Sequence, residues 1–144
     1  MKPIERHQAR EYALQALYQW QLSQDPISDI EAQFVAEHIS NALDFSYFQE
    51  LLHNIPKCFD ELDTLMHPFL KRSIKELDPV ELSVLRIALY ELSKRPDVHY
   101  RIIINEALEL TKQFGSIEGY KFVNGVLDQV ARGLRPHEMH ARKK

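Results

Sequence analysis

Two arginines near the start of the chain have the types and spacing of a nucleic-acid contact. Arg6 and Arg10 are four residues apart, so on a helix they lie on one face. Three further hydrogen-bond donors stand near them: Lys2, His7 and Gln8. Guanidinium groups bind phosphates and base edges bidentately, and single-stranded RNA is the favoured class because its bases can stack on aromatic and arginine planes. The alternative is that the arginines only pair with Glu5 and Glu11, and the residues alone leave both interpretations open.

The histidines and the single cysteine do not form a catalytic or metal-binding pattern. Of seven histidines, only His137 and His140 have ligand-like spacing, and no cysteine or pair of carboxylates accompanies them. Cys58, beside Phe59, is better explained as a packing residue than as a nucleophile. A glycine-rich phosphate loop is also missing. The sequence therefore predicts a protein that is not an enzyme and that needs no metal or small-molecule cofactor.

The net charge of −3 conceals two basic ends on an acidic body. Residues 1–10 carry +2 and residues 132–144 carry +4, which leaves −9 for residues 11–131. Basic ends suit a polyanion and an acidic body suits a basic protein, although the last three residues taken alone are better explained as a solvated tail. One cysteine, no signal peptide and no apolar run of about 18 residues predict a cytoplasmic protein without a membrane span.

The spacing of apolar residues predicts an all-α fold, because it is three or four nearly throughout and strand-like alternation is almost absent. At 144 residues and 44% hydrophobic, the chain fits one helical domain over residues 1–133, followed by a basic, flexible tail at 134–144. Pro56 is expected to open a new helical stretch, which Pro68 interrupts. The expected helices cover residues 5–22, 29–38, 46–54, 56–77 with a kink or break at Pro68 before 69–77, 79–92, 100–114 and 117–132.

Local signals mark the ends of the later helices. Asp78 is a natural N-cap, Pro79 suits the first helical position, and Glu81 completes a capping box. Gly115 is expected to end the next helix in a left-handed conformation, and Ser116 to cap the last one. The inner stripe that follows Asp78 should contain Leu82, Leu85, Leu89 and Leu92.

Three residues interrupt the apolar runs of the last two helices, namely Asn105, Asn124 and Gly125. A glycine inside a helix costs about 1 kcal/mol relative to alanine. From physics alone the favoured compensation is close helix–helix approach at Gly125 and a hydrogen-bonded asparagine in the core. The other possibility is that these positions are kept for function.

Motifs at four places follow one another along the chain: Ala9-Arg10-Glu11 with Leu14-Gln15-Ala16-Leu17-Tyr18, then Leu85 to Leu92, Ile104-Asn105-Glu106-Ala107, and Lys121 to Asp128. Together they closely resemble the NusB family of bacterial transcription antitermination factors, and the likeness runs from about Lys2 to Ala131. The resemblance implies about seven helices in two packed three-helix subbundles. It also implies a non-enzymatic adaptor that binds the boxA RNA of ribosomal RNA operons together with NusE, a small-subunit ribosomal protein, and helps RNA polymerase to read through terminators.

The resemblance implies two RNA-binding sites, since the family uses an arginine-rich N-terminal segment and the start of the last helix. The first maps onto Lys2, Arg6, His7, Gln8 and Arg10. The second maps onto Glu118, Lys121 and Phe122. We expect Phe122 to be a base-stacking platform rather than a core residue, because the inner stripe of this helix is already supplied by Val123, Val126, Leu127 and Val130.

The resemblance also implies a surface for NusE, which is strongly basic and suits the acidic body. Tyr18 and Leu22 would offer an exposed patch, and Glu81 would receive an arginine or lysine. From the residues alone, core packing of Tyr18 and simple capping by Glu81 are the better explanations. Two rival functions remain: a helical domain fused to an RNA cytosine methyltransferase, and a protein-binding scaffold whose basic ends serve solubility.

Overall fold

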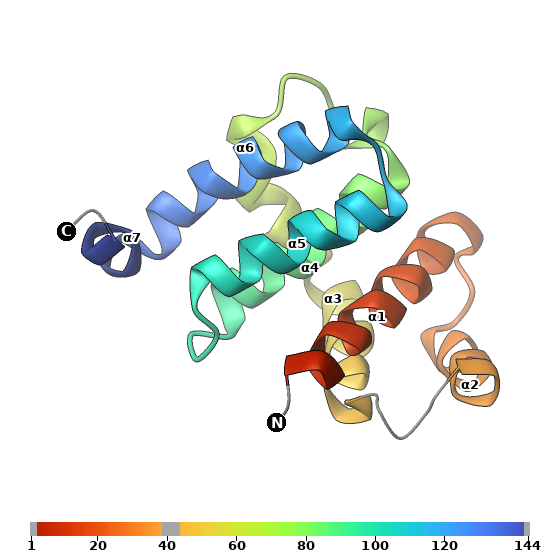
Figure 1. Cartoon of the computed structure of the whole chain (residues 1–144). Helices are drawn as coiled ribbons and strands as arrows, with labels where there is room; N and C mark the ends of the chain where they lie inside the picture. Colours follow the sequence, from red (N-terminus) through yellow and green to blue (C-terminus); the bar gives the residue numbers. More distant parts are fainter. Residues whose placement is uncertain (1–2, 39–43, 143–144) are drawn as a thin grey trace. The chain divides into compact units, whose positions relative to one another are not determined.

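The structure, a computed structural model, describes residues 3–38 and 44–142. Throughout those residues the regular elements are helical and no strand occurs, which confirms the predicted all-α class (Figure 1). The chain divides into two compact units, residues 1–58 and 59–144, and each is described by itself. In chain order the elements are α1 (Pro3–Ser23), α2 (Ile27–His38), α3 (Phe45–Met66), the 3-10 turns η1 (His67–Phe69) and η2 (Ile74–Glu76), α4 (Pro79–Lys94), α5 (Tyr100–Phe114), α6 (Ile117–Leu134) and α7 (Pro136–Arg142).

The first unit is built from α1, α2 and the beginning of α3. α1 packs against α2, and the rings of Phe34 and Phe48, with centroids 6.2 Å apart, join α2 to α3. Asp44 caps α3, because its Oδ1 accepts a hydrogen bond from the Tyr47 N–H at 3.1 Å. One face of α1 is buried through Ala9, Ala13, Ala16 and Leu17, and Trp20 is half-buried.

The break predicted at Pro56 occurs as a kink two residues later, inside the helical run α3 that ends at Met66. Two helical segments meet there, and Cys58 has the non-helical angles φ −127° and ψ 18°. A proline inside a helix removes one backbone hydrogen bond and crowds the preceding turn, which is the usual cause of such a distortion. The boundary between the two units falls directly after Cys58.

The predicted helix at residues 69–77 is wrong. Only the two short 3-10 turns η1 and η2 occur there, separated by bends. Leu70, Ser73 and Leu77 are extended, with ψ of 141°, 157° and 146°. Pro68 lies within η1 and limits how it can continue as an α-helix. The chain between α3 and α4 is therefore an irregular segment that places several polar residues in solvent.

α4 begins as predicted, with Asp78 as the N-cap. Its Oδ2 accepts hydrogen bonds from the N–H groups of Val80 and Glu81, both at 3.1 Å. The helix is buried on all sides from Glu81 to Leu92, so the predicted leucine stripe is only part of its buried surface. No reciprocal capping bond from the Glu81 carboxylate occurs in the described part of the chain, because this group lies against Gly119 of α6 instead.

A buried ion pair fixes α4 to the second part of α3. Arg86 donates to both carboxylate oxygens of Asp63, from Nε at 3.0 Å and from Nη2 at 2.8 Å. The guanidinium also lies over the Phe59 ring, 5.1 Å from its centroid. A bidentate, nearly dry pair of this kind is costly to break, because the remaining partner would be a buried charge.

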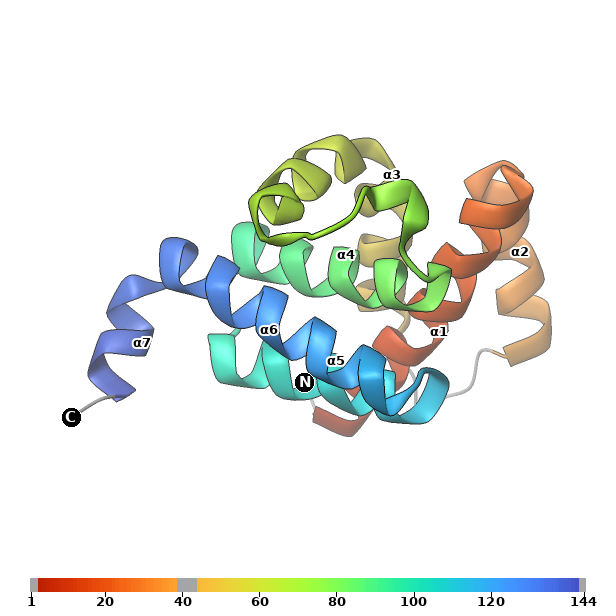
Figure 2. The same ribbon diagram turned by 90° about the horizontal axis from the view of Figure 1, so that it is seen from above.

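α5 and α6 form an antiparallel hairpin beside α4, as Figures 1 and 2 both show. Ser116 caps α6 as predicted, and its Oγ accepts a hydrogen bond from the Gly119 N–H at 3.0 Å. Gly115 does not adopt the predicted left-handed conformation: its φ is −118° and its ψ is −152°. Its small size serves a close approach instead, because a Cβ there would lie 3.0 Å from the Thr111 carbonyl oxygen.

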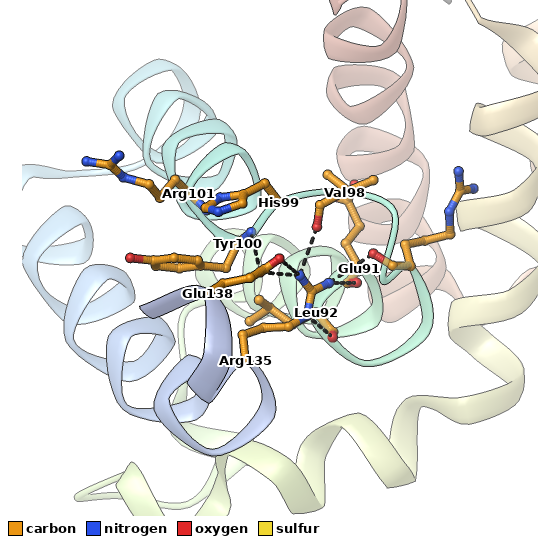
Figure 3. A network of polar contacts seen from close by, with 9 residues as sticks. Glu91, Leu92, Val98, His99, Tyr100, Arg101, Arg135 and Glu138 are labelled. Carbon is orange, nitrogen blue, oxygen red and sulfur yellow. Dashed lines mark hydrogen bonds and ion pairs between the residues drawn. The ribbon is translucent and has the colours of Figure 1, made fainter. Parts of the chain in front are cut away.

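Arg135, which directly follows α6, ties together four parts of the second unit (Figure 3). Its Nε donates a hydrogen bond to the carbonyl oxygen of Leu92 at 3.0 Å. Its Nη1 donates to the carbonyl oxygen of Val98 at 2.9 Å and to the Glu138 carboxylate at 2.7 Å. Its Nη2 reaches the carbonyls of Glu91 at 3.2 Å and Arg95 at 2.9 Å. The segment for which the sequence predicts a flexible tail is therefore helical at residues 136–142, with Glu138 of α7 bound to this network.

Candidate nucleic-acid interface

The aromatic ring of Tyr47 organises the basic face of α1. Arg6 lies with its guanidinium carbon 4.3 Å from the ring centroid, and Arg10 with its own at 5.5 Å. The four-residue spacing thus places both arginines on one side of the helix, as predicted, and the Tyr47 ring attracts both cations. No signal near the arginines indicated Tyr47, because it lies on α3, far away in the sequence.

Burial separates the two arginines. Arg10 is only 2% exposed, which leaves little of its side chain accessible to RNA in this conformation of the chain, and its contact with RNA stays a prediction. Arg6 is half-buried, and its Nε is buried without a hydrogen-bond partner in the described residues. The alternative pairing with Glu5 and Glu11 is not what holds Arg6 in place; its contact is the Tyr47 ring.

The other predicted donors of the N-terminal site differ from one another. His7 and Gln8 are half-buried, and His7 Nε2 lies 3.4 Å from Glu11 Oε1 on the same helix. Lys2 lies outside the described residues. Among the described residues of this site, Arg6 is the accessible arginine.

The start of α6 has the surface that the sequence predicts. Glu118 and Lys121 are exposed, and Phe122 is half-buried at the edge of the inner stripe. All four residues expected in that stripe are buried: Val123, Val126, Leu127 and Val130. Phe122 is therefore not a core residue, and its role as a base-stacking platform stays a prediction.

Arg72 lies over this phenylalanine and was not singled out by the sequence. It belongs to the irregular segment between η1 and η2, is exposed, and has its guanidinium carbon 5.7 Å from the Phe122 ring centroid. The adjacent basic pair Lys71-Arg72 in a segment bounded by Pro68 could have indicated it, had the segment been recognised as a loop.

Glu81 is less accessible than the predicted NusE contact requires. It is 8% exposed, and its Oε2 lies only 2.5 Å from where a Cβ on Gly119 would stand. Burial and then the charge of Asp78 raise the pKa of Glu81, and the Arg72 charge opposes them. The carboxylate thus lies beside both the first turn of α6 and the cation that covers Phe122.

Tyr18 and Leu22 on α1 are exposed, at 37% and 61%. Both side chains are therefore accessible to a partner. Asn105, Asn124 and Gly125 are exposed as well, and a Cβ on Gly125 would meet nothing within 4 Å. The expected core asparagine and close approach at Gly125 are therefore wrong, and core packing does not explain these three positions.

The described residues contain no group of histidine, cysteine and carboxylate side chains that could hold a metal ion. His137 and His140 are exposed on α7, and Cys58 is half-buried at the kink of α3. These side chains have the positions of surface and packing residues.

Several known proteins similar to this chain are NusB proteins. The model of the NusB family matches residues 7–132. The transcription antitermination protein NusB of Sodalis glossinidius (strain morsitans) is 55% identical over 137 residues, which cover 95% of this chain and 99% of that protein. The NusB protein of Escherichia coli O139:H28 is 55% identical over 138 residues, with 96% and 99% covered. A crystal structure of the antitermination factors NusB and NusE in complex with double-stranded RNA is similar with a TM-score of 0.78 and 27% identity, covering 92% of this chain and 99% of that one.

Proposed function

Because the chain belongs to the NusB family of transcription antitermination proteins, we infer that it is an RNA-binding adaptor rather than an enzyme. It binds boxA RNA of ribosomal RNA operons together with NusE in the cytoplasm. The resulting complex helps RNA polymerase to read through terminators.

The surface at the start of α6 is the observation that carries this proposal. Lys121 is exposed beside the half-buried Phe122, so a cation for phosphate and a ring for base stacking adjoin each other. A similar structure contains NusB and NusE with RNA, which supports the same class of ligand here. Lys2, Arg6, His7 and Gln8 contribute at the N-terminal site, with Arg6 the better-placed cation.

The proposal assigns NusE contacts to Tyr18 and Leu22 on α1 of the first unit and to Glu81 on α4 of the second unit. The first two are exposed aromatic and aliphatic groups of the kind that partners cover. The body of the chain, residues 11–131, carries −9, and a strongly basic partner complements it. Glu81 receives a cation of NusE only if its side chain moves away from Gly119, because it is buried there.

The adaptor works by joining two weak contacts. An RNA that binds this protein and NusE at the same time holds the two proteins close together. The high local concentration makes the complex of all three tighter than either contact alone. The match to this chain covers 99% of each of two antitermination proteins. This similarity favours the adaptor over a domain of an RNA methyltransferase.

A titration of the protein with boxA RNA, with NusE, and with both together tests the proposal. We expect weak, salt-dependent RNA binding by the protein alone and a much tighter ternary complex. A helical scaffold without RNA function would bind NusE equally well with and without RNA, and that result would refute the proposal.

A further inference from the structure

The irregular segment between α3 and α4 is the most basic short stretch of the described surface in the second unit. Lys71, Arg72 and Lys75 are exposed within five residues, and Glu76 is the only acidic residue from 67 to 76. Phe69, at the end of η1, is 38% exposed and adds an aromatic ring. None of these residues was assigned a role by sequence motif or by family resemblance.

This segment adjoins the proposed RNA contact on α6. η1 packs against α6, and Arg72 covers the Phe122 ring at 5.7 Å. We call the six residues together the Arg72 surface; they are Phe69, Lys71, Arg72, Lys75, Lys121 and Phe122. Two rings and four cations are thus contributed by two neighbouring elements of one unit.

The cations of the Arg72 surface form no ion pairs within the described residues, and Arg72 contacts the Phe122 ring. These cations are Lys71, Arg72, Lys75 and Lys121. Burial and then the charge of Asp78 raise the pKa of Glu81, and the charge of Arg72 partly offsets this rise. Four other arginines of this unit form ion pairs within the chain: Arg86, Arg95, Arg132 and Arg135. The exposed cations of the Arg72 surface have no carboxylate partner and are available to bind a polyanion.

We propose that the Arg72 surface binds single-stranded RNA and extends the α6 contact onto the segment between α3 and α4; this rests on the proposed function. Arg72 is held on the Phe122 ring, and its exposed guanidinium stacks on an unpaired base. The three lysines neutralise the phosphates on either side, and Phe69 offers a second ring. Since Arg10 is buried, much of the positive charge that meets the RNA comes from this surface.

Arg72→Gln tests the proposal against a matched control, Arg101→Gln. Arg101 is an exposed arginine on α5 of the same unit, and Figure 3 shows its side chain pointing away from the Arg135 network. Both variants lose one charge. We expect Arg72→Gln to weaken binding of a single-stranded boxA oligonucleotide about tenfold and to lower the salt slope by about one, with Arg101→Gln close to wild type.

Two further variants separate charge from stacking. Arg72→Lys keeps the charge, so we expect the salt slope to stay while the affinity falls, because an ammonium offers no plane to a base. The triple variant Lys71→Gln, Arg72→Gln, Lys75→Gln should lower the slope by about two, using the single-strand value per phosphate. Circular dichroism and melting of each variant check that the fold is intact.

The outcomes distinguish the inference from the function on which it rests. If wild type binds RNA with a normal salt slope and Arg72→Gln and the triple variant match Arg101→Gln, the Arg72 surface is not an RNA contact, although the adaptor function stands. If wild type fails to bind RNA both alone and with NusE, both proposals are overturned. Loss of NusE binding with unchanged RNA affinity would also overturn the inference.

Discussion

At the scale of single residues, spacing predicted where Arg6 and Arg10 point but not how far each is exposed. The ring that covers them comes from Tyr47 on α3, and a contact between distant parts of the chain leaves no local pattern in the sequence. The same holds for Arg72 and Phe122, whose partnership joins a loop to a helix. Residue types could therefore be predicted as RNA-binding, whereas burial had to be seen.

The two arginines of α1 should separate in a mutational test. Arg10→Ala should lower the free energy of unfolding by about 2 kcal/mol, because it removes the contact of a buried guanidinium with the Tyr47 ring. Arg6→Ala should lower the melting temperature less and weaken RNA binding more, since Arg6 is the accessible cation. Thermal melting and RNA titration of both single variants give the comparison. An unchanged RNA affinity for Arg6→Ala would remove the N-terminal site.

Phe122→Ala should lower RNA affinity by about 1–3 kcal/mol, the usual contribution of base–aromatic stacking. The fold should lose less than the roughly 3–5 kcal/mol of a core phenylalanine, because the ring is half-buried and the inner stripe is complete without it. Phe122→Leu is the control, since it keeps apolar bulk and removes the ring. A strongly destabilised variant whose folded fraction binds RNA normally would contradict the stacking role.

At the scale of elements, local signals predicted the starts of α4 and α6 correctly. Asp78 and Ser116 act within three residues of themselves, so their hydrogen bonds can be expected from sequence. The break expected at Pro56 occurs as a kink at Cys58, two residues later. The helix expected at 69–77 does not form, and Pro68 limits the backbone within the short 3-10 turn η1 that begins this segment. α7 was missed because Arg135, which anchors it, was counted as part of a basic tail.

The network of Arg135 and Glu138 gives α7 a defined response to pH. Burial alone would raise the pKa of Glu138, but hydrogen bonds from Arg135 and from the Tyr100 N–H outweigh it and lower this pKa below 4.5. A lowered carboxyl pKa stabilises the fold above the unfolded value, and that stability is lost as pH falls through the folded pKa. We expect acid-induced loss of α7 below about pH 4.5.

Glu138→Gln should remove most of that pH dependence and be less stable than wild type at pH 7. Glu109→Gln, which changes an exposed carboxylate paired only with Lys112, should retain it. Melting curves from pH 3 to pH 7 make the comparison. Parallel curves for wild type and Glu138→Gln would show that this carboxylate does not control the acid response.

At the scale of the whole molecule, the charge of Glu81 is expected to affect both the stability of the fold and the affinity for NusE. Because burial and Asp78 raise the pKa of Glu81, its ionised form opposes folding above that pKa, and this cost disappears below the unfolded pKa of 4.5. Glu81→Gln should therefore raise the melting temperature at pH 7 and loosen NusE. Glu81→Lys should loosen NusE further and leave binding of RNA alone largely intact. Unaltered NusE affinity in both variants would withdraw Glu81 from that surface.

The Arg135 network also orders events during synthesis of the chain. The carbonyls that Arg135 binds belong to residues 91–98 and precede it by 37 to 44 positions. A ribosome that adds about 5–20 residues per second needs about 2–9 s to cover that separation. During that interval the end of α4 and the turn after it lack their donor. The first unit ends at Cys58 and does not include Arg135, so it can fold before that residue is synthesised.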